Sequence, residues 1–307
     1  MCGEPGEIAF YADPGFVDLI DTWNEPLVSG CPDLSIVSAG VNEAQIVASI
    51  FPPLCNAIAS APIAYDAAAI VFYLDEAFSI TLSGDVIQDI FSGGISKWSD
   101  PALESLNPEV VFPDLEINVV SSSNSQLISA MERWSEELSG QARTFNLLQD
   151  DRDAVFSDLI YEMPAGSIGL FPLSEASTAG ATVANIQTKD AVLLPDQQSI
   201  YAASTMFTTE TNGQFVAAKF SSDSNPLPSP GTSQPALPYK ALVPVTLSIC
   251  NEDTLAARAI ARFAVRLDSQ GLIATSTLVG LEEKVRVVSA GVLGEGLPLP
   301  EVTEFTD

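Results

Sequence analysis

The sequence predicts an α/β protein with a largely parallel sheet, and three observations carry that prediction. Strand-like apolar runs alternate with helix-like amphipathic runs from the first residues onward. The chain has 307 residues and is 47% hydrophobic, which suffices for one large core or two modest ones, and the usual domain size favours two. The longest apolar stretch, residues 58–74, contains Pro62 and Asp66 and is too short to span a membrane, so we expect a buried strand there.

The first strand and helix are expected in "EIAFY" and "ADPGFVDLIDTW". Asp13 is suited to cap this helix, and Pro14 suits its first turn. A second strand and helix are expected in "DLSIVSAG" and "NEAQIVASIF". The helix predicted in "TLSGDVIQDIFSGGISKW" begins after the cap Ser83 and ends at Gly93. Its buried stripe consists of Val86, Ile87, Ile90 and Phe91.

The strand predicted in "LEINVV" leads into the segment "SSSNSQ" and then into an amphipathic helix. Further along, "DDRDAVFSDLIYEM" predicts a helix and "GSIGLFPL" a strand. Residues 221–239 are rich in Ser and Pro and predict a long loop or linker. Beyond it, "ALVPVTLSIC" predicts a strand and residues 252–278 one or two helices. The buried stripe of the helix after "SSSNSQ" is expected to be Leu127, Met131, Trp134 and Leu138.

Charge and composition exclude several functions. The chain has 40 Asp and Glu against 12 Lys and Arg and no His, a net charge of −28, which argues against nucleic acid or an anionic membrane surface as a partner. Without His and with scattered Cys, neither a zinc site nor a Ser-His-Asp triad can be assembled. We expect no metal, no cofactor and no catalytic residues. So acidic a chain suits a protein outside the cell or in salty surroundings, although solubility alone also explains the charge.

The segment of serines and Asn124 has two interpretations. Ser and Asn side chains commonly cap a helix by accepting hydrogen bonds from its first free N–H groups. The same groups, at the positive end of a helix dipole, make a site for an anion such as phosphate or a carboxylate. The first basic residue is Lys97, so the first third of the chain has no cationic side chain to offer an anion.

Several segments resemble the phosphate-binding subunits of bacterial ABC importers and their relatives. They are, in order, "SAPIAYDAAAIVFYL", "ITLSGDVIQDIFSGGISKWSDPALESLNPEV", "FPDLEINVVSSS", "PAGSIGLFPLSEA" and "LPDQQSIYAAS". The most specific part runs from Leu82 to Pro108. The resemblance implies a two-lobed, periplasmic-binding-protein-like clamp, in which each lobe is a sheet flanked by helices and two hinge strands join the lobes. It places lobe 1 at residues 5–74 plus 240–300 and lobe 2 at 75–225, with 226–239 as the Pro/Ser-rich loop or linker.

The resemblance also implies a ligand site of three loops that hold a small anion in the cleft. The first loop is "YADPGF" and the second is "SAGVNEA". The third departs from the family, because Ser122 stands where the family has an Arg that binds phosphate, so we expect weak phosphate binding. The family's Ser-Asp pair has no match here. The predicted ligand-binding residues are Asp13, Ser38, Gly40, Ser121, Ser122, Ser123, Asn124 and Ser125.

The cysteines carry two further predictions. "MCGEPGE" is similar to the mature end of a bacterial lipoprotein, which predicts lipid attachment at Cys2, with Met1 as a cloning addition; alternatively Cys2 is an accidental residue. A disulfide between Cys31 and Cys55 is expected, because both flank the same predicted strand and helix. The lipid anchor would place the protein in the periplasm or on the outer face of the cell membrane.

Two functions from different classes follow. The first is a solute-binding protein that delivers phosphate or another small ligand to an ABC permease. The second is a structural or accessory lipoprotein of a membrane complex, whose cleft would be filled by side chains. An enzyme is not expected, because Asp66 is better explained by a place near a hinge and Asp85 by the first turn of a helix.

Overall fold

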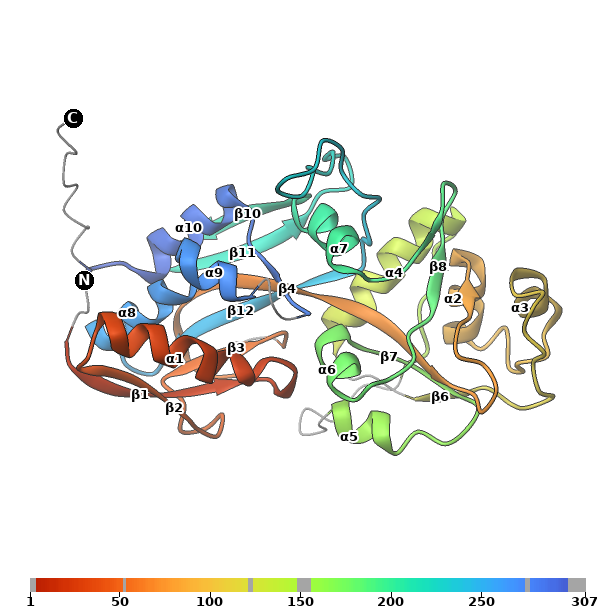
Figure 1. Cartoon of the computed structure of the whole chain (residues 1–307), viewed down its shortest axis with the longest axis horizontal. Coiled ribbons are helices and arrows are strands. Elements are labelled where there is room, and N and C mark those ends of the chain that lie inside the picture. The colour runs from red at the N-terminus through yellow and green to blue at the C-terminus, as the bar shows by residue number, and fades with distance from the viewer. Residues whose placement is uncertain (1–3, 52–53, 121–123, 148–155, 274–276, 298–307) are drawn as a thin grey trace.

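The computed structural model describes residues 4–51, 54–120, 124–147, 156–273 and 277–297. These residues form two lobes, and the long strand β4 (Ala57–Tyr73) runs from one into the other, as Figure 1 shows. The predicted α/β fold class, a two-lobed clamp of sheets flanked by helices, is confirmed.

The larger sheet has the strand order β10-β11-β4-β12-β3-β1-β2, and its pairing is mixed. β1 runs parallel to both β2 and β3, whereas β12 returns antiparallel between β3 and β4. The prediction of a largely parallel sheet is therefore wrong in this respect. The strands are β1 (Gly6–Ala12), β2 (Leu34–Ser38), β3 (Ile46–Ser49), β10 (Phe207–Asn212), β11 (Phe215–Phe220) and β12 (Leu242–Cys250).

Helices flank this sheet, and in Figure 1 α1, α8, α9 and α10 lie beside it. Trp23 of α1 and Phe10 of β1 are both buried and meet edge to face, which fixes α1 against the sheet. The short strand β13 (Val279–Gly280) pairs with β4. The helices are η1 (Pro14–Phe16), α1 (Asp18–Gly30), α7 (Gln197–Ser204), α8 (Leu255–Ala264), α9 (Leu267–Ile273) and α10 (Glu283–Leu293).

The second lobe is built around β7 (Ser167–Pro172), which pairs antiparallel with the C-terminal half of β4 and parallel with β6 (Asn118–Val120). A small sheet of β5 (Thr81–Leu82), β8 (Asn185–Gln187) and β9 (Val192–Leu193) completes it. The helices of this lobe are α2 (Gly84–Ser92), α3 (Pro101–Leu106), α4 (Ser125–Ser139), α5 (Phe156–Tyr161) and α6 (Leu173–Thr178).

Strand β4 confirms the interpretation of residues 58–74 as a buried strand. Its first part pairs with β12 up to Ala67, and its last part pairs with β7 from Ala68 onward. All but its first two residues and its last residue are buried. Asp66 therefore lies where the strand passes from one lobe to the other, as expected for a residue near a hinge.

Local patterns predicted α2 and α4 well. Ser83 caps α2 by accepting a hydrogen bond from Val86 N, and Gly93 ends the helix with a φ of 85°, in the left-handed region. The predicted stripe of α2 is buried in full. In α4, Leu127, Met131 and Trp134 are buried and Leu138 is half-buried. The helix predicted around residues 150–163 is described from Phe156 onward, and its earlier part lies outside the described residues.

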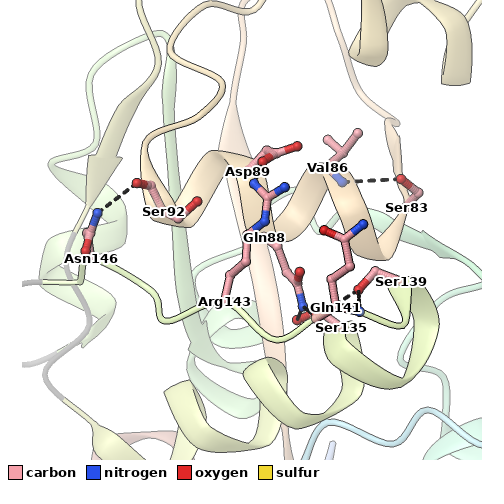
Figure 2. A network of polar contacts seen from close by, with 10 residues as sticks. All are labelled: Ser83, Val86, Gln88, Asp89, Ser92, Ser135, Ser139, Gln141, Arg143 and Asn146. Carbon is pink, nitrogen blue, oxygen red and sulfur yellow. Dashed lines mark hydrogen bonds and ion pairs between the residues drawn. The ribbon is translucent and has the colours of Figure 1, made fainter.

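Helices α2 and α4 pack unusually closely at Gly84. A Cβ at this position would lie 2.8 Å from Ser135 O and 2.7 Å from Leu138 Cβ. Figure 2 shows the polar contacts that hold residues 141–146 against α2. Gln88 Nε2 donates to Gln141 O at 2.5 Å, Asn146 Nδ2 donates to Ser92 O at 2.7 Å, and Arg143 forms an ion pair with Asp89.

The predicted disulfide between Cys31 and Cys55 is wrong. Cys55 is bonded to Cys250, the last residue of β12, with a Cα–Cα distance of 5.8 Å. The pairing follows from the sheet, because β12 lies beside β4 and places Cys250 opposite Ala57. Cys31 is disulfide-bonded as well.

The predicted lobe bounds stay a prediction. The hairpin of β10 and β11 falls within the predicted lobe 2, yet its strands join the larger sheet and lie beside α10 (Figure 1). Between Phe220 and Leu242 the chain forms no helix or strand, which matches the Pro/Ser-rich loop. Among the residues that the structure describes, no helix is long and apolar enough to cross a membrane.

Candidate functional site

The candidate site lies where elements of both lobes meet. The carboxyl ends of β1 and β3, the middle of β4, and the N-terminal ends of α4 and α6 come together there. Ligands of open α/β sheets commonly bind at such strand ends, and helix N-termini favour anions. We call this group the interlobe cluster; it consists of Tyr11, Asp13, Ser49, Asp66, Asn124, Ser174 and Glu175.

Asp13 is buried at the end of β1. Its Oδ2 accepts hydrogen bonds from Ser49 Oγ and Ile50 N, both at 2.8 Å. Its Oδ1 is buried and accepts no well-formed hydrogen bond from the described residues. Burial, with a smaller contribution from the nearby Asp66, raises the pKa of Asp13 to about 6. The predicted capping role is wrong, because the carboxylate turns to β3 and makes no cap hydrogen bond to the following helix.

Asp66 is fully buried in β4 and contacts the start of α6. Its Oδ2 accepts from Ser174 Oγ at 2.5 Å, and its Oδ1 accepts from Ala67 N at 2.7 Å and from Ser174 N at 3.3 Å. Burial raises the pKa of Asp66 to about 6, and the hydrogen bond from Ser174 opposes that rise. The N–H groups at the start of α6 are therefore already used by a carboxyl group of the chain itself.

Asn124 links the two lobes. Its Oδ1 caps α4 by accepting from Gln126 N at 2.8 Å and Leu127 N at 3.2 Å. Its Nδ2 donates to Ile50 O, across to the end of β3, at 3.3 Å. The capping interpretation is confirmed for Asn124, while Ser125 is exposed at the start of α4. Ser121, Ser122 and Ser123 lie outside the described residues, so their predicted role in ligand binding stays a prediction.

The first loop touches α6 directly. A Cβ on Gly15 would lie 2.1 Å from Ser174 Oγ and 2.8 Å from Glu175 Cγ, so only glycine allows this approach. Tyr11 faces the same region, and burial followed by the charges of Asp13 and Glu175 raises the pKa of its phenol to about 12. The two lobes are thus in contact at the cluster in this structure.

The predicted second loop is not part of these contacts. Ser38 and Gly40 are exposed at the end of β2, which is the edge strand beyond β1. A Cβ on Gly40 would meet the carboxylate of Glu43 at 2.5 Å, within the same loop. Ser49 and Ile50, at the end of β3, take the place expected for that loop. The role of Ser38 and Gly40 in ligand binding stays a prediction.

Sequence reasoning missed Tyr11, Ser49, Ser174 and Glu175. Ser49 was missed because the helix predicted in "NEAQIVASIF" is wrong: Ile46–Ser49 form the strand β3, and Ser49 is its last residue. Ser174 and Glu175 lie in "PLSEA", a segment quoted above for its resemblance to the family, but nothing local showed that it would face Asp66. Such contacts depend on how distant strands pair.

The chemistry of the cluster is mainly that of a hydrogen-bond acceptor. Among the described residues, its charged side chains are the acids Asp13, Asp66 and Glu175. The backbone donors at three places are occupied by the chain's own side chains: Ile50 N by Asp13, Ser174 N by Asp66, and the start of α4 by Asn124. The described part of the chain holds no group of three or more His, Cys, Asp or Glu side chains placed to bind a metal.

A separate cavity of about 780 Å³ lies away from the cluster. It is formed by α7, residues 227–232 and the segment that leads into α10, and its lining includes Tyr201, Leu267 and Glu282. No predicted site residue lines it. Its size falls within the range of small-molecule sites, but it contains none of the groups that the sequence analysis singled out.

Comparison with curated proteins finds short similarities. A segment of 45 residues is 47% identical to the phosphate-binding protein PstS of Xylella fastidiosa and covers 15% of this chain and 12% of that protein. A segment of 63 residues is 32% identical to the phosphate-binding protein PstS 3 of Mycobacterium tuberculosis H37Rv, covering 20% of this chain and 17% of that protein. The similarity thus spans less than a fifth of either relative. No protein-family model matches the chain.

Comparison with solved structures covers nearly the whole chain. A putative phosphate ABC transporter substrate-binding protein with bound phosphate, from Clostridium perfringens, superposes with a TM-score of 0.56 at 17% identity, over 90% of this chain and 100% of that one. A phosphate-binding protein from Stenotrophomonas maltophilia gives 0.52 at 14% identity, over 93% of both chains. At such identities the likeness shows the fold. This chain has the two-lobed fold of phosphate ABC transporter substrate-binding proteins.

Proposed function

We propose that this protein is an extracytoplasmic solute-binding component of the ABC-importer type, which captures a small solute between its lobes and presents it to a permease. The observation that carries the proposal is the meeting of Asp13, Asn124 and Ser174, from both lobes, at the carboxyl ends of β1 and β3. The shared fold with phosphate-binding proteins supports a binding function rather than catalysis.

Phosphate is expected to be a poor ligand. An oxyanion in the interlobe cluster would face acidic side chains, and it would compete with Asp13 and Asp66 for the N–H groups of Ile50 and Ser174. The serine at position 122, where the family resemblance leads us to expect an Arg, points the same way. Losing one charged hydrogen-bonding partner in a buried site costs about 2 to 5 kcal/mol, roughly 30-fold to a few thousand-fold in dissociation constant.

Isothermal titration of the full chain with inorganic phosphate tests this expectation. At micromolar protein concentration and neutral pH, we expect weak binding or no measurable heat. Tight phosphate binding by the unmodified chain would contradict the expectation that this site lacks the contacts needed to hold phosphate.

Asn124→Ala should remove the cap of α4, which lowers the free energy of unfolding by about 1 kcal/mol and lowers the melting temperature with it. Ser125→Ala, at an exposed position in the same turn, is the matched control.

A second function is supported by the contact between the lobes. Because the Gly15 loop lies against Ser174 and side chains fill the cluster, the clamp is also suited to a structural or accessory subunit of a membrane complex. Titrations of the unmodified chain and of Asn124→Ala with other small anions and polar solutes separate the two functions. If such a solute binds the unmodified chain, and if Asn124→Ala no longer binds it, the solute-binding component is favoured. An absence of binding across such solutes, with only a lowered melting temperature in the variant, favours the accessory subunit.

We also propose export of the protein and its attachment to the membrane by a lipid on Cys2, through the polar segment that follows it. Mass spectrometry of protein purified from its native membrane should find a diacylglycerol thioether on the N-terminal peptide. Cys31 is disulfide-bonded and Cys55 is bonded to Cys250. Within one chain, a lipid on Cys2 and a disulfide between Cys2 and Cys31 exclude each other, because a thioether sulfur cannot form a disulfide. Peptide mapping that joins Cys2 to Cys31, or unlipidated protein in the cytosolic fraction, would therefore refute the anchor.

A further inference from the structure

The carboxyl groups of Asp13 and Asp66 occupy positions where an anion would be expected. Asp13 accepts from Ile50 N at the end of β3, and Asp66 accepts from Ser174 N and Oγ at the start of α6. Free N–H groups at strand ends and helix N-termini bind anions readily, because they carry partial positive charge and lack other partners. In this chain, internal carboxyl groups satisfy those donors, so the lobes need no solute to complete their hydrogen bonds.

The same residues lie at the contact between the lobes. Asn124 Nδ2, from the start of α4, donates to Ile50 O, and Gly15 lies against Ser174 and Glu175 at the start of α6. Separation of the lobes would break the first contact and expose the second. Water would then reach Asp13 and Asp66, which are buried in the closed arrangement.

The groups that face the two carboxyls add no positive charge among the described residues. β1 contributes Tyr11, β3 contributes the neutral Ser49, α4 contributes the neutral Asn124, and α6 contributes Glu175. Asp13 and Asp66 also act on each other. Ionisation therefore places like charges in a region that excludes water, which is costly unless the region opens.

We propose that the interlobe cluster is a proton-controlled latch, in which protonated Asp13 and Asp66 hold the lobes closed, and loss of their protons favours an open clamp that solute can enter. The latch regulates the site proposed above and rests on that proposed clamp function. It predicts that capture of solute is favoured at neutral pH and that the empty clamp closes upon itself in acid.

The sign follows from the pKa values. Both carboxyls have a pKa raised from 3.8 to about 6 in the closed arrangement, mainly by burial. A raised pKa means that the closed arrangement binds the proton more tightly, so its advantage is complete below pH 3.8 and is lost as the pH rises through about 6. One such carboxyl changes the ratio of open to closed molecules on the order of tenfold between about pH 5 and pH 8.

Native-state hydrogen exchange of the full chain, without any solute, tests the latch. We expect the protection factors of the Ile50 and Ser174 amides, corrected for intrinsic exchange, to fall from about pH 5 to pH 8 by about tenfold for each carboxyl that the opening exposes, and so by up to about a hundredfold. In the double variant Asp13→Asn and Asp66→Asn, which keeps an acceptor oxygen at each position, this fall should disappear. Asp85→Asn, at an exposed acid in the first turn of α2, should leave it unchanged.

A single variant keeps the proposal testable if the double variant does not fold. Ser174→Ala removes a donor that favours the charged form of Asp66, so the transition in protection should move to higher pH. Protection that does not vary with pH in the unmodified chain, or the same variation in the double variant, would overturn the latch. Because no solute is present, failure of phosphate binding and failure of the latch are separate results.

Discussion

Replacing both Cys55 and Cys250 by Ala is expected to lower the free energy of unfolding by about 2 to 5 kcal/mol. The bond joins residues 195 positions apart. Because it closes so long a loop, it strongly lowers the conformational entropy of the unfolded chain. It also fixes the end of β12 to the segment before β4, next to the small buried group of Ala44 and Val47. The chain-entropy argument gives a value near the upper end of the range, and loss of packing at the buried Cys250 adds to it.

Chemical denaturation of the oxidised protein and of the double Ala variant measures this difference. Ala is preferred to Ser because Cys250 is fully buried and a hydroxyl there would lack an assured partner. Titration of the double variant with dithiothreitol then isolates the contribution of the disulfide at Cys31. If the oxidised protein and the variant are equally stable, the prediction is wrong, and residual structure in the unfolded chain already keeps the two ends of this loop close together.

The elements that sequence predicted best are those set by neighbouring residues. Ser83 and Gly93 mark the ends of α2 by cap chemistry, and the spacing of Val86, Ile87 and Ile90 gives its buried face. The apolar run of β4 likewise needs no distant partner to be recognised as buried. These signals depend on hydrogen bonds and burial within one turn or one strand, so a single sequence carries them.

The arrangement of strands was beyond such signals. Nothing local shows that β12 inserts antiparallel between β3 and β4, yet this insertion makes the sheet mixed and brings Cys250 to Cys55. The predicted bond from Cys31 to Cys55 relied on nearness along the chain. Pairing of strands nearly two hundred residues apart is decided by the total burial of the fold, which no short segment reports.

The candidate site shows the same division. Asp13 and Asn124 were predicted because loops and caps at strand-to-helix junctions are visible in sequence, and both lie in the interlobe cluster. Their chemistry was not predicted, since the orientation of the Asp13 carboxylate towards Ile50 depends on the pairing of β1 with β3. Asp66 was expected near a hinge, but its bond to Ser174 requires the contact of β4 with α6.

Gly84→Ala is expected to destabilise the second lobe by about 1 to 3 kcal/mol, although alanine is the better helix former. The added Cβ would lie 2.7 Å from Leu138 Cβ, 2.8 Å from Ser135 O and 3.0 Å from Ser139 N. Two of these atoms belong to the backbone of α4, so a side-chain rotation cannot relieve the overlap. Helix α2 must move away from α4, which stretches the contacts of Gln88 and Asn146 shown in Figure 2.

Gly291→Ala is the matched control for this prediction. Gly291 also lies in a helix, α10, but no atom comes within 4 Å of its Cβ position, so the same change should be neutral or should stabilise the protein by up to about 1 kcal/mol. Urea denaturation, followed by the fluorescence of the three buried tryptophans Trp23, Trp98 and Trp134, compares the two variants. If Gly84→Ala proves as stable as Gly291→Ala, the prediction is wrong. Helices α2 and α4 then tolerate a wider separation, and their stability does not depend on the close approach at Gly84.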